Sequence, residues 1–156
     1  MTKQRWLGTV LLLAACGGGG GAEAVKPASS ATGAVQGFMQ AVADSNVEKM
    51  ALLWGTATGP AAKTNQPPDW ERRVAIMQAY LRNQSFRIMS DSPETDENRR
   101  AIQVEIRRET CTWTVPFVAV KSRDGSWLVN QVDLAAAGNP ARPCSEETLT
   151  DSVPQD

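Results

Sequence analysis

The sequence predicts an α+β fold in which N-terminal helices pack on one face of an antiparallel sheet of three to four strands or more. Apolar residues recur at helical spacing as far as Leu81. From Phe86 to Val132 they alternate with polar residues instead, which is the period of half-buried strands. The helices come first and the strands follow. This order favours an α+β domain over an alternating α/β domain.

The first two predicted helices have apolar faces and start signals. The first begins near Thr32, which is the expected N-cap. Its apolar residues at i, i+3, i+4 and i+7 share one face. They are Val35, Phe38, Met39 and Val42. The second helix, residues 47–54, follows Ser45, which opens an S-x-x-E capping box.

A loop and a third helix complete the helical half. Residues 56–68 contain Gly59-Pro60 and Pro67-Pro68, which predict a loop. Asp69 is the expected cap of the third helix, which extends to Asn83.

The second half predicts strands separated by polar turns. Residues 86–89 alternate, residues 91–98 form an acidic loop, and residues 102–107 form the clearest strand. The strand that begins at Cys111 changes phase near Pro116, as a bulge or an edge-strand proline would cause. Asp124-Gly125 predicts a hairpin turn, and residues 127–132 form the last strand.

Composition excludes several classes of function. The chain has 156 residues, a formal net charge of −1 and a pI of about 5.5, which argues against a nucleic-acid partner. It contains no histidine, so Ser-His-Asp and Cys-His catalysis and histidine-ligated metals are excluded. We expect no cofactor and no metal site.

The N-terminus predicts export and a lipid anchor. Lys3 and Arg5 precede a short apolar stretch, residues 6–13, which is too short to span a bilayer. The segment ends Leu13-Ala14-Ala15-Cys16, which resembles the lipobox of bacterial lipoproteins. The resemblance implies cleavage after a signal peptide of residues 1–15 and acylation of Cys16, which would anchor the protein to a membrane stably. An ordinary signal peptide with a coincidental cysteine is the alternative.

Residues 16–30 are predicted to tether the folded domain to the lipid. Five glycines follow Cys16, and Gly-rich segments behave as flexible coils. A phosphate-binding loop would need a strand before it and a lysine or a defined glycine spacing, and these are missing. Because residue 17 is Gly rather than Asp, similarity to Gram-negative lipoproteins implies an outer-membrane location facing the periplasm.

The predicted domain, residues 31–134, resembles the NTF2-like fold and, within it, small bacterial lipoproteins of the DUF4878 type. The resemblance rests on the helix over residues 34–44, the short capping-box helix 47–54 and the closing D-G-x-W-x-V segment at residues 124–129. It implies a curved sheet and a cavity enclosed between that sheet and the helices. Some relatives of this fold are enzymes that work without histidine.

Two cysteines outside the lipobox predict a disulfide. Cys111 and Cys144 form an even pair in a compartment that we expect to be oxidising. The bond would tie the predicted tail, residues 135–156, to the sheet. Two free thiols or a redox pair are the alternatives, but there is no C-x-x-C spacing.

Aromatic and large apolar residues are the candidates for lining a pocket, although packing in the core is the better explanation for most of them. They are Phe38, Trp54, Met77, Tyr80 and Trp113. No acidic residue is in phase with the predicted interior positions, so we predict no catalytic residue. Those interior positions are Phe38, Val42, Trp54, Val74, Met77, Leu81, Ile102, Val104, Ile106, Trp113 and Val115.

Two charged segments have simple interpretations. The acidic residues of 91–97 lack the spacing of a calcium loop, and we expect a solvated loop there. The pairs Arg99-Arg100 and Arg107-Arg108 flank a strand that also carries Glu105 and Glu109, which favours mixed-charge pairing across strands.

The sequence therefore predicts a lipid-anchored envelope protein with a non-catalytic module that binds a small apolar ligand or another envelope protein. The alternatives are a pocket enzyme of the isomerase or hydrolase type that uses a carboxylate, and a purely structural envelope lipoprotein. The oligomeric state is open, a dimer included.

Overall fold

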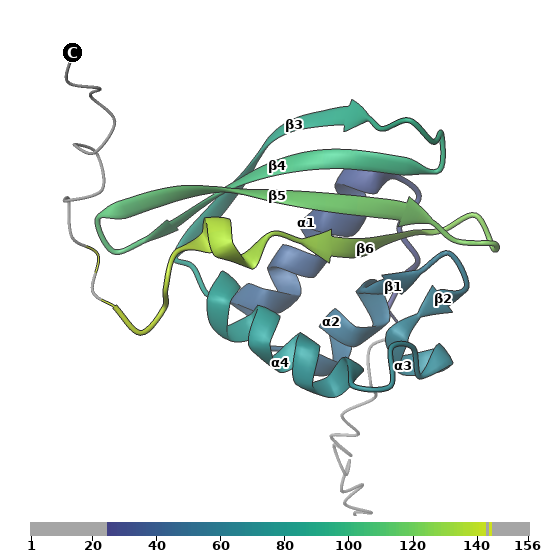
Figure 1. Cartoon of the computed structure of the whole chain (residues 1–156), viewed down its shortest axis with the longest axis horizontal. Coiled ribbons are helices and arrows are strands. Elements are labelled where there is room, and N and C mark those ends of the chain that lie inside the picture. The colour runs from purple at the N-terminus through teal and green to yellow at the C-terminus, as the bar shows by residue number, and fades with distance from the viewer. Residues whose placement is uncertain (1–24, 143, 145–156) are drawn as a thin grey trace, which may run out of the picture.

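The computed structural model describes residues 25–142 and residue 144. The predicted signal peptide, Cys16, the glycine run and most of the predicted tail lie outside these residues. Helices cover one face of a four-stranded antiparallel sheet (Figure 1), so the predicted α+β class and its order of elements are confirmed.

The elements follow one another in a simple order. The helices are α1 (Ala31–Ala43), α2 (Val47–Leu53), α3 (Ala61–Thr64), α4 (Trp70–Leu81) and the 3-10 helix η1 (Leu134–Ala137). A two-stranded hairpin, β1 (Gly55–Thr56) and β2 (Gly59–Pro60), lies between α2 and α3. The main sheet consists of β3 (Ser85–Pro93), β4 (Arg99–Arg108), β5 (Cys111–Lys121) and β6 (Trp127–Val132), in the order β3-β4-β5-β6.

Both predicted N-caps of the first two helices were wrong by one or two residues. Ser30, not Thr32, caps α1, because its hydroxyl accepts a hydrogen bond from the Gly33 N–H. Asn46 caps α2 by accepting from the Lys49 N–H at 2.9 Å. Ser45 instead has a φ of 53° and forms the turn between the helices, so the expected capping box is not made.

The predicted loop 56–68 was also wrong, because it contains β1, β2 and α3. The hairpin depends on two glycines. A Cβ atom on Gly55 would overlap the carbonyl oxygen of Gly59, and Gly59 itself has a φ of 137°. Pro60 then precedes the first residue of α3 and occupies its N-cap position.

The sheet departs from the predicted strand boundaries in two places. β3 continues to Pro93, so residues 91–93 belong to a strand and not to the acidic loop. The predicted phase change near Pro116 does not occur, because Pro116 pairs in register with Gln103. The irregularity comes later, where Val118 pairs with Gln131 and Ala119 with Val129, which leaves Asn130 of β6 as the extra residue.

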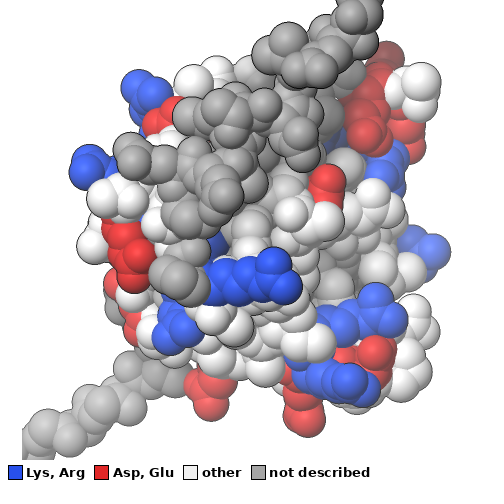
Figure 2. Space-filling view, turned by 60° about the vertical axis from the view of Figure 1, so that its left-hand side comes forward, with Lys and Arg blue, Asp and Glu red and all other residues white. Residues whose placement is uncertain are grey.

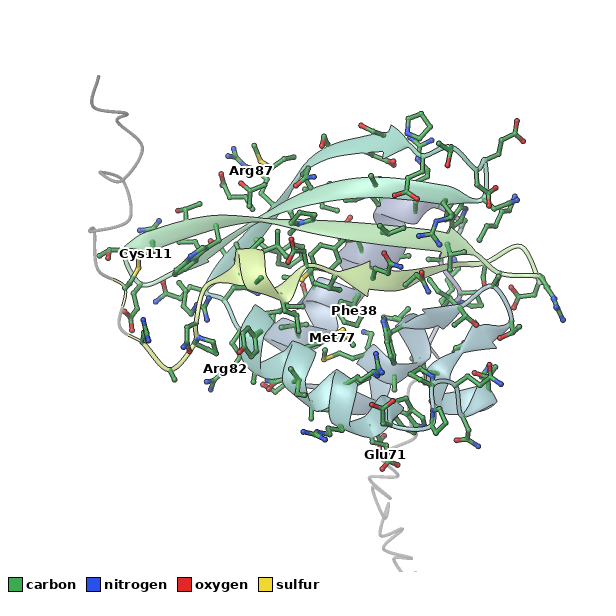
Figure 3. All side chains as sticks on the ribbon, viewed as in Figure 1. Phe38, Glu71, Met77, Arg82, Arg87 and Cys111 are labelled. Atoms are coloured by element: carbon green, nitrogen blue, oxygen red, sulfur yellow. A yellow bond between two sulfur atoms is a disulfide. The ribbon has the colours of Figure 1, made fainter. Side chains whose placement is uncertain are left out.

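The core lies between α1 and the sheet. Phe38 of α1 packs edge-on against Phe117 of β5 with ring centroids 6.4 Å apart, and Figure 3 shows the buried Met77 of α4 below Phe38. Every predicted interior residue is buried except Trp113, which is half-buried. Within the described part of the chain, no helix is both long and apolar enough to cross a membrane.

Segments on both sides of the predicted domain belong to the described fold. Ala28, in the predicted tether, accepts a hydrogen bond from the Trp127 N–H at 2.9 Å. At the other end, residues 135–137 were expected in a loose tail but form part of η1, whose first turn is capped by Asp133.

Candidate functional site

The five predicted pocket residues lie at different depths. Phe38, Trp54 and Met77 are buried in the core, whereas Tyr80 and Trp113 are half-buried. None of them lines either of the two surface grooves described below.

Trp54 joins the β1–β2 hairpin to the sheet. It forms a parallel bridge with Val129, and its indole N–H donates to the Asn130 carbonyl oxygen at 3.0 Å. The side-chain amide of Asn130 donates to the Gly55 carbonyl oxygen at 2.8 Å. The bulge in β6 therefore provides the residue that holds the hairpin beside this strand.

Trp113 stacks against the half-buried guanidinium of Arg108. The guanidinium carbon of Arg108 lies 4.6 Å from the centre of the Trp113 ring, and Arg108 Nη2 donates to the Ala137 carbonyl oxygen. Its Nε and Nη1 atoms are buried without a hydrogen-bond partner among the described residues. Burial, together with the positive charge of Arg82, lowers the pKa of Arg108 from its ordinary value. Figure 3 shows Arg82 near the end of α4, on the same side of the molecule as Cys111, the register partner of Arg108.

The other predicted arginine pairs have partners that differ from those expected. Arg99 donates to Glu94 at 2.9 Å, and Arg100 pairs with Asp91. Glu105 pairs across the sheet with Arg87, which points away from the helices in Figure 3. Mixed-charge pairing is present and includes Glu105 of β4 as expected, but its other acidic partners are Asp91 and Glu94, and Glu109 belongs to none of the ion pairs among the described residues.

The two cysteines outside the lipobox lie close together. Their Cα atoms are 5.8 Å apart, which is within the range of a disulfide. Cys111 starts β5 and pairs in register with Arg108 at the end of β4 (Figure 3).

Charges on the face seen in Figure 2 are mixed. Blue and red side chains are interspersed among white ones over the described atoms in view. A charged site must therefore be sought in local groups of residues and not in a broad patch on this face.

Two surface grooves flank the segment by which the described chain enters the domain. Their shared wall includes Val25, Pro27, Ala28, Leu52 and Leu53. The first, which we call the α1–α2 groove, has a volume of about 630 Å³. The second, which we call the hairpin groove, has a volume of about 490 Å³. It lies between the β1–β2 hairpin with α3 on one side and the turn between β5 and β6 on the other.

The charges of the two grooves differ. The α1–α2 groove has two cations and two carboxylates, namely Lys26, Lys49, Asp44 and Glu48. The hairpin groove has the two cations Lys63 and Arg123 and one carboxylate, Asp124. Of the four ion pairs formed among the described residues, none includes Lys63 or Arg123.

The carboxylate of Asp124 is bound within its own turn. One of its oxygens, Oδ1, accepts from the hydroxyls of Ser122 and Ser126 and from the Ser126 N–H. Hydrogen bonds from Ser122 and Ser126 lower the pKa of Asp124 to about 2. The group therefore stays ionised at neutral pH, and its donors belong to the turn itself.

The sequence predicted the turn at Asp124 but not the groove beside it. Lys63 lay in a predicted loop, and Arg123 preceded a turn, so neither residue carried a local signal for binding. The two segments meet because β1 lies beside β6, which is a contact between distant parts of the chain.

The structure also shows what is buried in the described interior. Apart from Ser122, every buried residue identified among the described ones is apolar or glycine. The candidate site is therefore the hairpin groove at the surface rather than a polar cavity beneath the sheet.

Comparisons of the chain with models of known protein families, with curated proteins and with solved structures gave no match.

Proposed function

We propose that the chain is a lipid-anchored protein of a bacterial cell envelope, on the outer membrane and facing the periplasm, whose folded part is a non-catalytic binding module. We further propose that this module has the NTF2-like, DUF4878-type architecture. The membrane is then a partner through the lipid on Cys16, and a ligand is bound by the domain.

The anchor is supported by the sequence before and at Cys16. A basic start, a short apolar stretch and Leu-Ala-Ala-Cys occur in the order that a lipoprotein signal requires. Val25, the first described residue, lies only nine positions after Cys16. A fully extended segment of that length spans about 30 Å, so a lipid on Cys16 would hold the grooves close to the membrane surface.

The architecture is supported by the order of the elements. Two helices, a third long helix and then an antiparallel meander agree with the pattern that suggested the NTF2-like fold. The layer between α1 and the sheet is filled with apolar side chains such as Phe38 and Phe117. A ligand would therefore bind at the surface grooves and not between the helices and the sheet.

The binding role rests on one observation. The hairpin groove combines two cations that have no ion-pair partner among the described residues with an apolar floor. Small-molecule sites commonly combine apolar walls with a few polar groups that orient the ligand. Catalysis by a carboxylate would instead need an acid held in an apolar pocket, and Asp124 has its pKa lowered to about 2 at the surface.

The anchor is tested by labelling cells with a clickable palmitate analogue and separating their membranes. We expect label and membrane association for the unaltered chain and for Cys111→Ser, and no label for Cys16→Ser. Absence of label from the unaltered chain would contradict the anchor.

The binding role is tested by thermal unfolding of residues 16–156 carrying Cys16→Ser in the presence of neutral, anionic and cationic amphiphiles. We expect at least one class to raise the unfolding temperature, because a ligand that binds only the folded state stabilises it. No shift with any class would contradict a module that binds small amphiphiles.

A further inference from the structure

We propose that the hairpin groove binds anionic amphiphiles, in which a phosphate or carboxylate head is attached to a short apolar chain. This inference rests on the proposed binding role and names the ligand class. Lys63 and Arg123 would hold the head group, and the apolar floor would hold the chain.

The groove has walls that are joined to each other. The Arg123 N–H donates to the Ala57 carbonyl oxygen at 3.0 Å, which links the β5–β6 turn to the tip of the β1–β2 hairpin. Within that hairpin side, the Thr64 hydroxyl at the end of α3 donates to the carbonyl oxygen of the helix's own N-cap, Pro60, at 3.0 Å. The site therefore needs little ordering when a ligand binds, which favours affinity.

The charges favour a negative head group. Lys63 and Arg123 are exposed side chains that line the same groove, and neither belongs to an ion pair among the described residues. Asp124 is the one carboxylate among the described residues of the lining, and its Oδ1 oxygen is occupied by Ser122 and Ser126. An oxyanion near the two cations would accept charge-assisted hydrogen bonds, which are stronger than neutral ones.

The apolar floor of the groove favours an anion that carries an apolar chain. Leu52, Leu53, Pro60, Trp127 and Leu128 all line the groove. Its volume of about 490 Å³ accommodates a small molecule larger than inorganic phosphate. Each methylene that leaves water completely raises affinity about fourfold. The alkyl chain should therefore add measurably to the affinity of the head group.

The neighbouring α1–α2 groove lacks this charge bias. Its two lysines are matched by Asp44 and Glu48, and Asp44 accepts a hydrogen bond from Gln40 at 3.0 Å. The hairpin groove is thus the groove that selects for an anion.

The test is isothermal titration calorimetry of residues 16–156, carrying Cys16→Ser, with octyl phosphate below its critical micelle concentration. We expect saturable binding that Lys63→Glu and Arg123→Glu each weaken by about tenfold or more, since a charge-assisted hydrogen bond contributes about 1.5–3 kcal/mol. Lys63→Arg should keep the affinity within about threefold, because it keeps the charge.

Arg72→Glu is the matched control. Arg72 is an exposed arginine on α4 that does not line the hairpin groove, so the same change of charge should leave binding unaltered. The urea midpoint of every variant shows that it is folded. Neither Lys63 nor Arg123 uses its side chain in an ion pair among the described residues, so both variants should fold.

Two further ligands distinguish the contribution of the anionic head group from that of the alkyl chain. Octyltrimethylammonium should not bind, and inorganic phosphate should bind about tenfold more weakly than octyl phosphate or worse. Equal affinity for inorganic and octyl phosphate would indicate a free-phosphate site and overturn the amphiphile. No binding of octyl phosphate, or binding that neither charge reversal weakens, would overturn the site itself.

The outcomes also distinguish this inference from the proposed function. If a neutral or cationic amphiphile raises the unfolding temperature while octyl phosphate does not bind, the ligand class is wrong and the binding role remains. If no class has an effect, both fail.

Discussion

Among single residues, Arg108 has the most demanding surroundings in the described part of the chain. Two of its nitrogens are buried without a partner there, while the third donates to Ala137 and the cation stacks on Trp113. A buried charge without a carboxylate is costly, whereas the stem and the stacking contribute favourable packing. The unfavourable burial of the charge and the favourable packing of the stem therefore oppose each other, and substitutions can separate the two contributions.

We expect Arg108→Ala to lower the free energy of unfolding by about 1–2 kcal/mol, because it removes the stacking and the hydrogen bond. Arg108→Met keeps an unbranched apolar stem over Trp113 and removes the unpartnered charge, so its loss should stay below about 0.5 kcal/mol. Urea unfolding, followed by circular dichroism, measures both. Equal losses in the two variants would show that the charge itself stabilises the fold.

Burial was predicted well from the sequence, and helix caps were not. Periodicity placed Phe38, Val104 and Ile106 in the core, and all three are fully buried. Hydrophobic periodicity predicts a buried face from many residues together, so one residue that departs from the pattern does not change the prediction. A cap depends on one polar residue among neighbours of the same kind, and Ser30 and Asn46 could not be distinguished from Thr32 and Ser45 by type.

At the scale of elements, the β1–β2 hairpin decides whether the candidate site exists. Its two strands have only two residues each, which is too short for stability alone. The hairpin is held by contacts from elsewhere in the chain, namely those of Trp54 with Val129 and Asn130. The sequence of this segment therefore predicts a loop, since local preference alone does not form the hairpin.

Two glycine-to-alanine substitutions compare the effect of an added side chain in the hairpin with its effect in a helix. Gly55→Ala places a Cβ atom against the backbone of Gly59, which cannot move aside as a side chain would. We expect it to cost about 2 kcal/mol or more in the free energy of unfolding and to weaken ligand binding in the hairpin groove.

Gly37→Ala is the matched control. Gly37 lies within α1, and its added Cβ would meet the Leu53 side chain at 3.5 Å, an ordinary contact. Alanine should therefore stabilise the helix by about 0.5–1 kcal/mol. Chemical unfolding measures both variants, and a Gly55→Ala protein as stable as the unaltered chain would show that the hairpin tolerates a side chain.

For the whole molecule, the sequence predicted the order of helices and strands but not where distant segments meet. The candidate groove joins residues 58–64 to residues 122–128, and the bulge at Asn130 helps to bring them together. The contact between these two segments depends on the arrangement of the whole sheet. The predicted cysteine pair was different, because the number of cysteines and the expected oxidising compartment alone indicated which residues should be close.

The same pair allows a test of how the end of the chain is held. A bond between Cys111 and Cys144 spans 33 residues that include β5, β6 and η1. Closing a loop of that length in the unfolded chain stabilises the folded state by about 3–4 kcal/mol on chain entropy. We expect Cys111→Ser, Cys144→Ser and the double variant to lose similar amounts of unfolding free energy, since either substitution breaks the whole bond. A reductant should lower the stability of the unaltered chain by a similar amount and leave the variants unchanged.

Losses that add in the double variant would mean that the two cysteines act independently. In that case mass spectrometry of the non-reduced protein should show no linked Cys111–Cys144 peptide, and η1 would be held by its packing, its Asp133 cap and Arg108 without the bond.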